Sequence, residues 1–358
     1  MNTVLVTGGC GFIGSAFILN TISNGVGRIV NVDCVSYAGN PENLASVQHS
    51  DSYIHLAIDI GDADAIANAL NRFQPDAIVN FAAETHVDRS ISSPRSFIDT
   101  NVTGTFVLLE ATRVWWSALT VERRRRFRFL HVSTDEVYGS LDMTDPPFTE
   151  QTAYAPSSPY AASKAASDHL VRAYGKTYEM PVLITNCSNN YGPRQFPEKL
   201  IPFMIVRMLS GATLPIYGDG QNVRDWLFVD DHCSAIWCVL NGAEPGETYN
   251  IGGGTELSNK SLVERLCQIL DELRPRADGV SYCSRIEFVR DRPGHDRRYA
   301  INSEKLAAQL GWRAQSELQD RLRQTVVWYL ENPGWVARVT SGEYRNWVNK
   351  NYDDRPGR

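Results

Sequence analysis

A glycine-rich turn that directly follows the first apolar run is the feature that most constrains this chain. The stretch "VLVTGGCGFIGSAF" places Gly8, Gly11 and Gly14 after a predicted strand and at the start of a predicted helix. Glycines at this spacing let the backbone turn tightly and approach a pyrophosphate, which then lies at the positive end of the helix. The second apolar run, "RIVNVD", ends in Asp33, and a carboxylate there binds the ribose hydroxyls of NAD and repels the additional phosphate of NADP. The pattern predicts an NAD site. The alternative explanation, a helix-capping glycine loop beside an unrelated aspartate, is much weaker.

Short apolar runs alternate with helical patterns through the first half of the sequence. The predicted strands are "TVLVTG", "RIVNVD", "YIHLAID", "DAIVNFAA", "FRFLHVS" and "PVLITN". The predicted helices span 12–22, 62–73, 97–113 and 158–178. This alternation indicates βαβ units, whose parallel sheet is covered by helices on both faces. We therefore predict an α/β fold, a Rossmann-type doubly wound parallel sheet with a smaller C-terminal α/β domain that binds the substrate.

The alternation stops near residue 190, where short segments punctuated by Pro and Gly begin. We predict that residues 1–190 form the NAD-binding domain, to which 226–255 return. Residues 191–225 and 256–330 are assigned to the smaller domain, and 331–358 to a C-terminal tail.

Three helices open on residues that are suited to cap them. An acidic residue, Asp62, precedes one helical pattern, and Ser158 followed by Pro159 precedes another. In the smaller domain, the spacing of Ser261 to Glu264 fits a capping box, so we predict a helix that begins near Ser261. Its apolar face is lined by Leu262, Leu266, Ile269 and Leu273.

Composition excludes several classes of protein. A net charge of -6 argues against a surface for nucleic acid, and the basic run 123–126 is interpreted as a solvated connection. Seven cysteines and seven histidines without metal-ligand spacing predict neither a disulfide framework nor a metal site. No apolar run approaches the ~18 residues of a membrane span, and no leader precedes the first strand. We expect a cytoplasmic protein.

The stretch "SPYAASK" places Tyr160 and Lys164 one turn apart on the same helix face. A phenol, with a pKa of about 10, is a weak base near neutrality. A nearby ammonium, together with the positive nicotinamide, stabilises the phenolate and makes Tyr160 a plausible base for a sugar hydroxyl. An exposed Tyr and Lys at helical spacing are common, but beside the glycine loop the catalytic interpretation is favoured.

Two adjacent acids, Asp135 and Glu136, follow Thr134 at the end of an apolar strand in "HVSTDEVYG". A solvated turn is one explanation. The other is a working acid and base, because two carboxyls placed close together raise the pKa of one of them.

These motifs resemble the extended branch of the short-chain dehydrogenase/reductase family, whose members act on nucleotide sugars. Thr134 matches the Thr or Ser of that family. The family more often shows Lys-Leu-Thr where Cys34, Val35 and Ser36 stand here, and Thr85 stands where Ser is usual. The resemblance covers nearly the whole chain, through "DCVSYAGNPENL", "FAAETHVDRSI", "NVTGTFVLLEA", "STDEVYG", "YAPSSPYAASKAASDHLVRAY", "NNYGPRQFPEKLIP", "YGDGQNVRDWLFVDDH" and "RDRPGHDRRYAI".

The resemblance implies a dehydratase, because epimerases of this branch carry small neutral residues after the Thr. The expected substrate is dTDP-glucose and the expected product dTDP-4-keto-6-deoxyglucose, a precursor of rhamnose or other deoxysugars. Tyr160 takes the C4 hydroxyl proton while NAD, tightly bound and recycled, takes the C4 hydride. Glu136 then removes the C5 proton, Asp135 protonates the departing C6 hydroxyl, and the hydride returns to C6.

The resemblance also implies three groups of site residues. The catalytic group is Thr134, Asp135, Glu136, Tyr160 and Lys164. The NAD-binding group is Gly8, Gly11, Phe12, Ile13, Gly14, Asp33, Ser36, Asp59, Ile60, Phe81, Ala82, Ala83, Thr100, Tyr160 and Lys164. The substrate-binding group is Thr85, Thr134, Asn190, Glu198, Lys199, Leu200, Pro215, Tyr217, Arg224, Asn259, Arg292 and His295.

Only part of the substrate group has support from the residues themselves. Lys199, Arg224 and the loop 292–295 offer the charge-assisted donors that a diphosphate binds, although a surface ion pair is the alternative for each. His86 and Asp88 could equally have a structural role, and they are left out of the catalytic group.

Other functions remain open at this point. UDP-glucose dehydratases share Thr-Asp-Glu, so the sequence does not separate thymine from uracil. Decarboxylases and GDP-mannose dehydratases place Ser before the Glu, so Asp135 argues against both. A non-catalytic NAD-bound sensor is disfavoured because every catalytic position is filled.

The family also implies a homodimer, formed through helices 97–113 and 158–178, whose large residues occupy more than one face. These residues are Phe97, Phe106, Leu108, Leu109, Leu170, Val171 and Tyr174.

Overall fold

The computed structural model describes residues 1–342, and its centre is a seven-stranded parallel sheet. The strand order is β10-β6-β5-β4-β1-β2-β3, and every neighbouring pair is parallel. All six predicted strands are confirmed. The seventh strand, β10, lies in the segment 226–255, which was expected to return to the NAD-binding domain. The strands are β1 (Thr3–Thr7), β2 (Arg28–Val32), β3 (Tyr53–Leu56), β4 (Ala77–Asn80), β5 (Arg128–Thr134), β6 (Val182–Cys187) and β10 (Thr248–Ile251).

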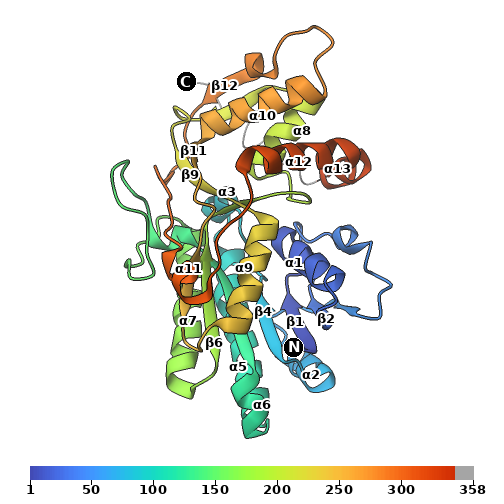
Figure 1. The fold of residues 1–358 in the computed structure, drawn as a ribbon, viewed down its shortest axis with the longest axis vertical. Helices are drawn as coiled ribbons and strands as arrows, with labels where there is room; N and C mark the ends of the chain where they lie inside the picture. Colours follow the sequence, from blue (N-terminus) through green and yellow to red (C-terminus); the bar gives the residue numbers. More distant parts are fainter. Residues whose placement is uncertain (343–358) are drawn as a thin grey trace.

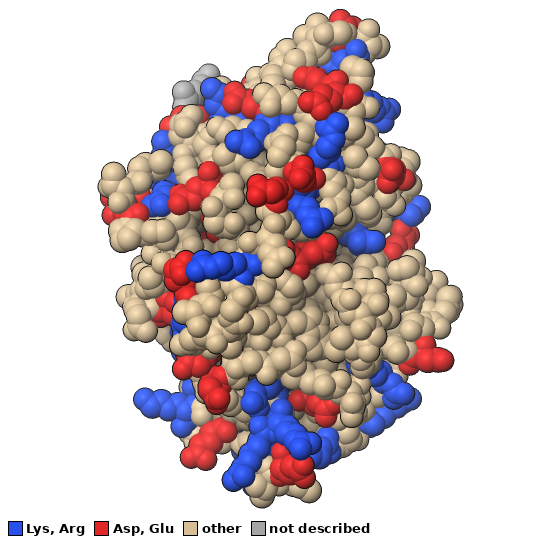
Figure 2. All heavy atoms as spheres, in the orientation of Figure 1, with Lys and Arg blue, Asp and Glu red and all other residues tan. Residues whose placement is uncertain are grey.

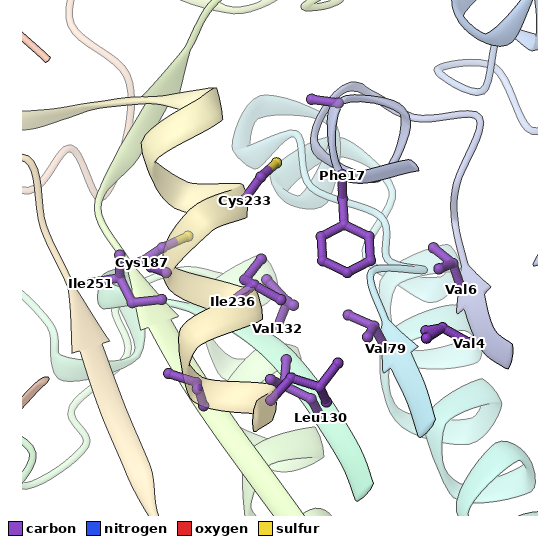
Figure 3. Close-up of a cluster of buried hydrophobic side chains, with 14 of the residues drawn as sticks. Val4, Val6, Phe17, Val79, Leu130, Val132, Cys187, Cys233, Ile236 and Ile251 are labelled. Atoms are coloured by element: carbon purple, nitrogen blue, oxygen red, sulfur yellow. The ribbon is translucent and has the colours of Figure 1, made fainter. Parts of the chain in front are cut away.

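Helices cover both faces of this sheet, as a doubly wound fold requires (Figure 1). Alternate residues of β1 point to opposite faces. Val4 and Val6 pack under α1 (Phe12–Ser23) and α9 (Val229–Gly242), where Figure 3 shows Phe17 beside Ile236. Leu5 packs on the other face, which is covered by α2 (Ala63–Phe73), α5 (Thr105–Ser117) and α7 (Pro159–Tyr178). The α/β prediction is correct.

The chain is helical through the whole of the predicted range 97–113, but 98–104 form a π-helix and not an α-helix. A short helix, α4 (Arg95–Phe97), leads into a π-helix, η2 (Ile98–Gly104), before α5 begins. The π segment is rich in β-branched residues, which crowd the turns of an α-helix. It also positions Asn101, whose amide donates to Ser163 Oγ at 2.8 Å and whose Oδ1 accepts from the Glu84 N–H at 2.8 Å. Periodicity alone cannot reveal these hydrogen bonds, because they join residues that are distant in the sequence.

Helix α10 (Asn259–Leu273) also begins earlier than predicted. Its N-cap is Ser258, whose Oγ accepts from the Ser261 N–H at 3.2 Å, so the proposed cap at Ser261 was wrong. The chain turns directly from a strand into this helix, which leaves Glu264 to pair with Lys260 at 3.7 Å instead of closing a capping box. The other two predicted caps are confirmed: Asp62 accepts from the Ala65 N–H and Ser158 from the Ala161 N–H.

The smaller domain lies beyond the carboxyl ends of the sheet strands (Figure 1). Its strands are β7 (Asn189–Tyr191), β8 (Leu214–Tyr217), β9 (Val223–Phe228), β11 (Glu256–Ser258) and β12 (Ile286–Val289), which form the sheets β11-β9-β7 and β12-β8. Its hydrophobic cluster joins α10 to α8 (Leu200–Ser210), α12 (Leu318–Glu331) and α13 (Pro333–Val339).

Two segments lie elsewhere than the predicted domain limits suggest. Helix α11 (Glu304–Leu310) packs on β10 and α9 of the main domain through Leu306. The first part of the predicted tail forms α13, whose Trp335 is buried and donates to Asn43 Oδ1 at 2.9 Å. The rest of that tail, 343–358, lies outside the described residues.

Charged side chains are mixed over the surface. The basic run 123–126, predicted as a connection, lies in a short helix, α6 (Val121–Arg126), in which Arg126 pairs with Glu122 at 3.0 Å. In Figure 2 the basic side chains at the lower end, where Figure 1 places α6, lie beside acidic ones. Within residues 1–342, no helix combines the length and the apolar character that crossing a bilayer requires.

Candidate active site

A cavity of about 290 Å³ opens where the main sheet faces the smaller domain. It lies at the carboxyl ends of β1, β2, β4, β5 and β6, which is where ligands bind in open α/β sheets. All of the residues predicted for NAD binding line it, and so do the five predicted catalytic residues.

The glycine loop has the shape that close approach to a pyrophosphate requires. Gly8 has φ +67°, and a Cβ at this position would lie 2.7 Å from the backbone nitrogen of Ala82, so no other residue fits there without movement. Asp33 is tied to the same loop, because its Oδ2 accepts from the Cys10 N–H at 2.7 Å and its Oδ1 from the Val35 N–H at 2.7 Å. The carboxylate keeps lone pairs that can accept from ribose hydroxyls. The loop and Asp33 therefore fit NAD.

Tyr160 and Lys164 project from the first turns of α7 and are both buried. Burial and the Glu136 charge raise the pKa of Tyr160 well above its usual value, while a hydrogen bond with Thr134 lowers it. Burial lowers the pKa of Lys164 to about 8. Lys164 Nζ donates to the Val132 carbonyl at 2.8 Å, and stabilisation of the phenolate by Lys164 together with the nicotinamide stays a prediction.

The acid pair lies in a short 3-10 helix, η3 (Asp135–Tyr138), immediately after β5. Thr134 caps it, accepting from the Glu136 N–H at 3.3 Å and donating to Asp135 Oδ1 at 3.3 Å. Asp135 is only 1% exposed, so the interpretation as a solvated turn is excluded. Its Oδ2 is buried and has no hydrogen-bond partner among the described residues.

The two acids differ in their charged neighbours. Burial raises the pKa of Asp135 well above its usual value, and the charges of Glu136 and Asp225 raise it further. Burial also raises the pKa of Glu136, but Arg292, Lys199 and Arg224 all lower it. The surroundings of Asp135 therefore favour its protonated form, while three cations favour the ionised form of Glu136.

The three cations come from distant parts of the chain. Lys199 Nζ donates to the Thr85 carbonyl at 2.7 Å. Arg224 donates to the Asp296 carbonyl at 3.0 Å. Arg292 pairs with Asp88 at 3.4 Å. Tertiary structure thus gathers positive charge opposite the acid pair.

The predicted substrate residues fall into two sets. Thr85, Thr134, Asn190, Glu198 and Lys199 line the cavity. The remaining seven lie outside its lining, in the smaller domain or its loops, and are Leu200, Pro215, Tyr217, Arg224, Asn259, Arg292 and His295.

Glu198 has contacts that the sequence did not indicate. Its carboxylate accepts from Tyr37 Oη at 2.9 Å and from Arg89 Nε at 3.1 Å, and the Arg89 guanidinium lies 3.9 Å from the centre of the Tyr37 ring. His86 caps α3 (Val87–Ser92) through the Arg89 N–H, in agreement with its structural interpretation. Asp88 bridges Arg292 and Tyr217 at the edge of the site, although sequence reasoning left it out.

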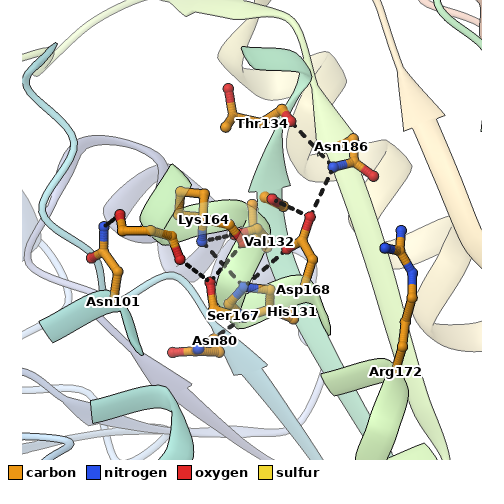
Figure 4. A network of polar contacts seen from close by, with 12 residues as sticks. Asn80, Asn101, His131, Val132, Thr134, Lys164, Ser167, Asp168, Arg172 and Asn186 are labelled. Atoms are coloured by element: carbon orange, nitrogen blue, oxygen red, sulfur yellow. Dashed lines mark hydrogen bonds and ion pairs between the residues drawn. The ribbon is translucent and has the colours of Figure 1, made fainter. Parts of the chain in front are cut away.

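A buried polar network behind β5 was also missed. It joins Lys164 to His131 and Asp168 (Figure 4). The spacing of Lys164 and Asp168, one helical turn apart, was a signal that could have identified it. No cluster of three or more His, Cys, Asp or Glu side chains that could hold a metal ion occurs in the part of the chain that the structure describes.

Known proteins are similar to this chain in sequence and in fold. Residues 5–325 match the family model described as GDP-mannose 4,6 dehydratase. The chain is 53% identical to dTDP-glucose 4,6-dehydratase 1 of Escherichia coli (strain K12), over 98% of this chain and 99% of that protein. It is 56% identical to the dTDP-glucose 4,6-dehydratase of Xanthomonas campestris pv. campestris (strain B100), over 96% of this chain and 98% of that protein.

Solved structures agree with these relatives. The crystal structure of a dTDP-glucose 4,6-dehydratase from Bacillus anthracis str. Ames in complex with NAD has a TM-score of 0.83 and 43% identity, and the match covers 95% of this chain and 100% of that chain.

Proposed function

This chain belongs to the GDP-mannose 4,6 dehydratase family, and from that premise we propose that it is an NAD-dependent hydro-lyase that converts dTDP-glucose to dTDP-4-keto-6-deoxyglucose. The observation that carries the proposal is the pair Asp135 and Glu136, in which burial and two acids raise the pKa of Asp135 and three cations oppose the effect of burial on Glu136. Elimination of water needs both an acid and a base in one site.

Each catalytic side chain has a defined task. Tyr160 accepts the proton of the C4 hydroxyl, and Thr134, which bonds to it, orients that hydroxyl. NAD held by the Gly8 loop and Asp33 would supply the hydride acceptor for C4 and the hydride donor for C6. Oxidation at C4 acidifies the C5 hydrogen, which Glu136 removes as a proton and gives back to C5 when C6 is reduced. Asp135 gives its proton to the C6 oxygen, which leaves as water.

The Asp135 Oδ2 atom supports the role of proton donor. It is buried and unpartnered among residues 1–342, an arrangement that costs free energy unless a ligand satisfies it. A C6 hydroxyl would accept the hydrogen that Asp135 carries. Lys199, Arg224 and Arg292 would neutralise the diphosphate of the nucleotide sugar.

Mass spectrometry of the nucleotide sugar tests the proposal directly. Purified protein is incubated with dTDP-glucose or UDP-glucose, without added NAD. Loss of one water from dTDP-glucose is the expected result, and the ratio of the two rates measures the preference for thymine over uracil. No mass change with either sugar, even after NAD is added, would overturn the proposed reaction.

We also propose that two copies associate through the outer face of α5, the π segment and α7. Ile98, Phe106 and Val114 are 46%, 45% and 56% exposed on this face, which is unusual for large apolar side chains so close together in sequence. Of the other residues considered for this interface, Phe97, Leu108, Leu109, Val171 and Tyr174 are buried within the monomer. The dimer contact therefore rests on fewer residues than the sequence indicated.

A cytoplasmic location is the final part of the proposal. Cys34 is an exposed free thiol, and the cysteines are odd in number, a pattern that suits a reducing compartment. Cell fractionation with an antibody to the protein tests it, and recovery in the membrane or secreted fraction would contradict it.

A further inference from the structure

We propose that His131 and Asp168 are positioning residues for Lys164. The three side chains form a buried polar unit that sets the position and the charge of the Lys164 ammonium group. The inference rests on the proposed function only in giving Lys164 a catalytic task. Neither His131 nor Asp168 lines the cavity, so neither acts on the substrate directly.

The three side chains are in contact and withdrawn from water. His131 and Asp168 have no exposed surface, and Lys164 is 3% exposed. Lys164 Nζ lies 3.2 Å from His131 Nε2, and His131 Nε2 lies 3.4 Å from Asp168 Oδ1 (Figure 4). The Asp168 oxygen that faces this contact is buried and accepts no hydrogen bond among the described residues. His131 thus separates the ammonium from its counter-ion.

Hydrogen bonds deeper in the sheet set the orientation of the His131 ring. Thr7 Oγ1 donates to Asn80 Oδ1 at 2.5 Å, and the Asn80 amide nitrogen lies 3.0 Å from His131 Nδ1. The ring is therefore held at both nitrogens, by Asn80 at Nδ1 and by Lys164 at Nε2. Burial, with Lys164 and Arg172, lowers the pKa of His131 well below its usual value, so the ring stays neutral.

Asp168 is held as the counter-ion by three donors to its other oxygen. Ser133 Oγ, Tyr154 Oη and Asn186 Nδ2 lie at 2.9, 2.8 and 3.3 Å from Oδ2. Burial raises the pKa of Asp168, whereas Lys164, these hydrogen bonds and Arg172 lower it.

The charge of Asp168 in turn opposes the effect of burial on Lys164. Burial favours the neutral amine, while Asp168 and, more weakly, the Cys187 thiol on β6 favour the ammonium. Breaking a buried pair by removing one partner leaves the other charge uncompensated. The unit therefore favours the charged form of Lys164 against the effect of burial.

Direct titration of Lys164 is the decisive measurement. The chain has six lysines, so selective 13C labelling at lysine Cε gives a spectrum that Lys164→Arg assigns. In the holoenzyme, Asp168→Asn should lower the pH at which Lys164 titrates by about one unit, because the charge that favours the ammonium is removed. The alkaline limb of the kcat profile should move in the same direction. Ser167→Ala is the matched control, since Ser167 is buried on the same helix but bonds only to backbone carbonyls. It should leave both measurements unchanged.

His131 variants separate positioning from folding. His131→Phe keeps the ring volume and removes both nitrogens, so kcat should fall about tenfold or more while KM stays the same. His131→Gln restores a polar side chain beside Lys164 Nζ and Asp168 Oδ1 and should recover most of the loss. These variants also decide the proposal if Asp168→Asn does not fold. A Lys164 titration and alkaline limb unchanged in Asp168→Asn, or wild-type kcat in His131→Phe, would overturn it, and either result is independent of which nucleotide sugar is the substrate.

Discussion

Asp135 and Glu136 are consecutive in sequence, yet their carboxyl groups lie in different electrostatic surroundings. Asp135 is closed off from water and faces two further acids, Glu136 and Asp225, whereas Glu136 faces Arg292, Lys199 and Arg224. Burial and the charges of Glu136 and Asp225 favour the protonated form of Asp135, against Arg224, and the three cations favour the ionised form of Glu136, against burial. This difference assigns the acid and the base.

Glu136→Gln should block loss of water while slow formation of reduced cofactor on mixing with dTDP-glucose continues. The amide keeps the shape but cannot take the C5 proton, so turnover should fall by about 10²–10⁴-fold. Stopped-flow absorbance and mass spectrometry measure the two steps separately. The exposed Glu122 provides the control variant Glu122→Gln, which should turn over normally. Unimpaired turnover by Glu136→Gln would refute its role as the base.

Tyr160→Phe should suppress the first hydride transfer itself. The variant lacks the hydroxyl that accepts the C4 proton, so no reduced cofactor should appear on mixing with substrate. A rapid absorbance change equal to that of the unmodified protein would show that another group removes this proton.

Asp135→Asn should make the folded protein more stable at neutral and alkaline pH. The folded pKa of Asp135 is raised, so the carboxyl adds stability only while it is protonated, and that stability is lost as the pH rises through the folded pKa. Asparagine removes this dependence. Thermal unfolding at a series of pH values should show a difference in Tm that is largest at high pH and disappears below about pH 4, the unfolded pKa. A lower Tm for the variant at pH 8 would contradict the prediction.

Gly8→Ala should abolish retention of NAD. The added Cβ would press on the Ala82 backbone, which also adjoins the cavity, so the loop must move away from its pyrophosphate-binding shape. Gly25 has the same φ of +67°, with nothing within 4 Å, so Gly25→Ala carries only the conformational strain. Chromatography of the nucleotide released from each purified variant makes the comparison. Equal NAD content in both variants would show that close packing of Gly8 is not needed.

Phe106→Asp should convert the proposed dimer to a monomer. A carboxylate on this apolar face would have to be desolvated at the interface, which is costly. Size-exclusion chromatography with light scattering measures the mass. Met143→Asp is the control, because Met143 is also exposed, at 57%, but lies in a loop away from α5. A monomeric unmodified protein at assay concentrations would rule out the dimer.

The sequence by itself determined the local elements and the chemistry they carry. The alternation of strands and helices, the Gly8 turn, the Asp33 carboxylate and the caps at Asp62 and Ser158 all depend on residues close together in the chain. Period, turn chemistry and capping act over a few residues, so they can be identified without knowing the fold.

Only the tertiary structure decided how those residues behave. The π segment before α5 is held by Glu84 and Ser163, and the first N–H groups of α10 donate to the Asn222 and Gly220 carbonyls, so both depend on contacts with distant parts of the chain. The charges that separate Asp135 from Glu136 come from residues far along the chain, and so do the partners of His131. Burial and long-range electrostatics set the pKa of each group, and neither is encoded in local spacing.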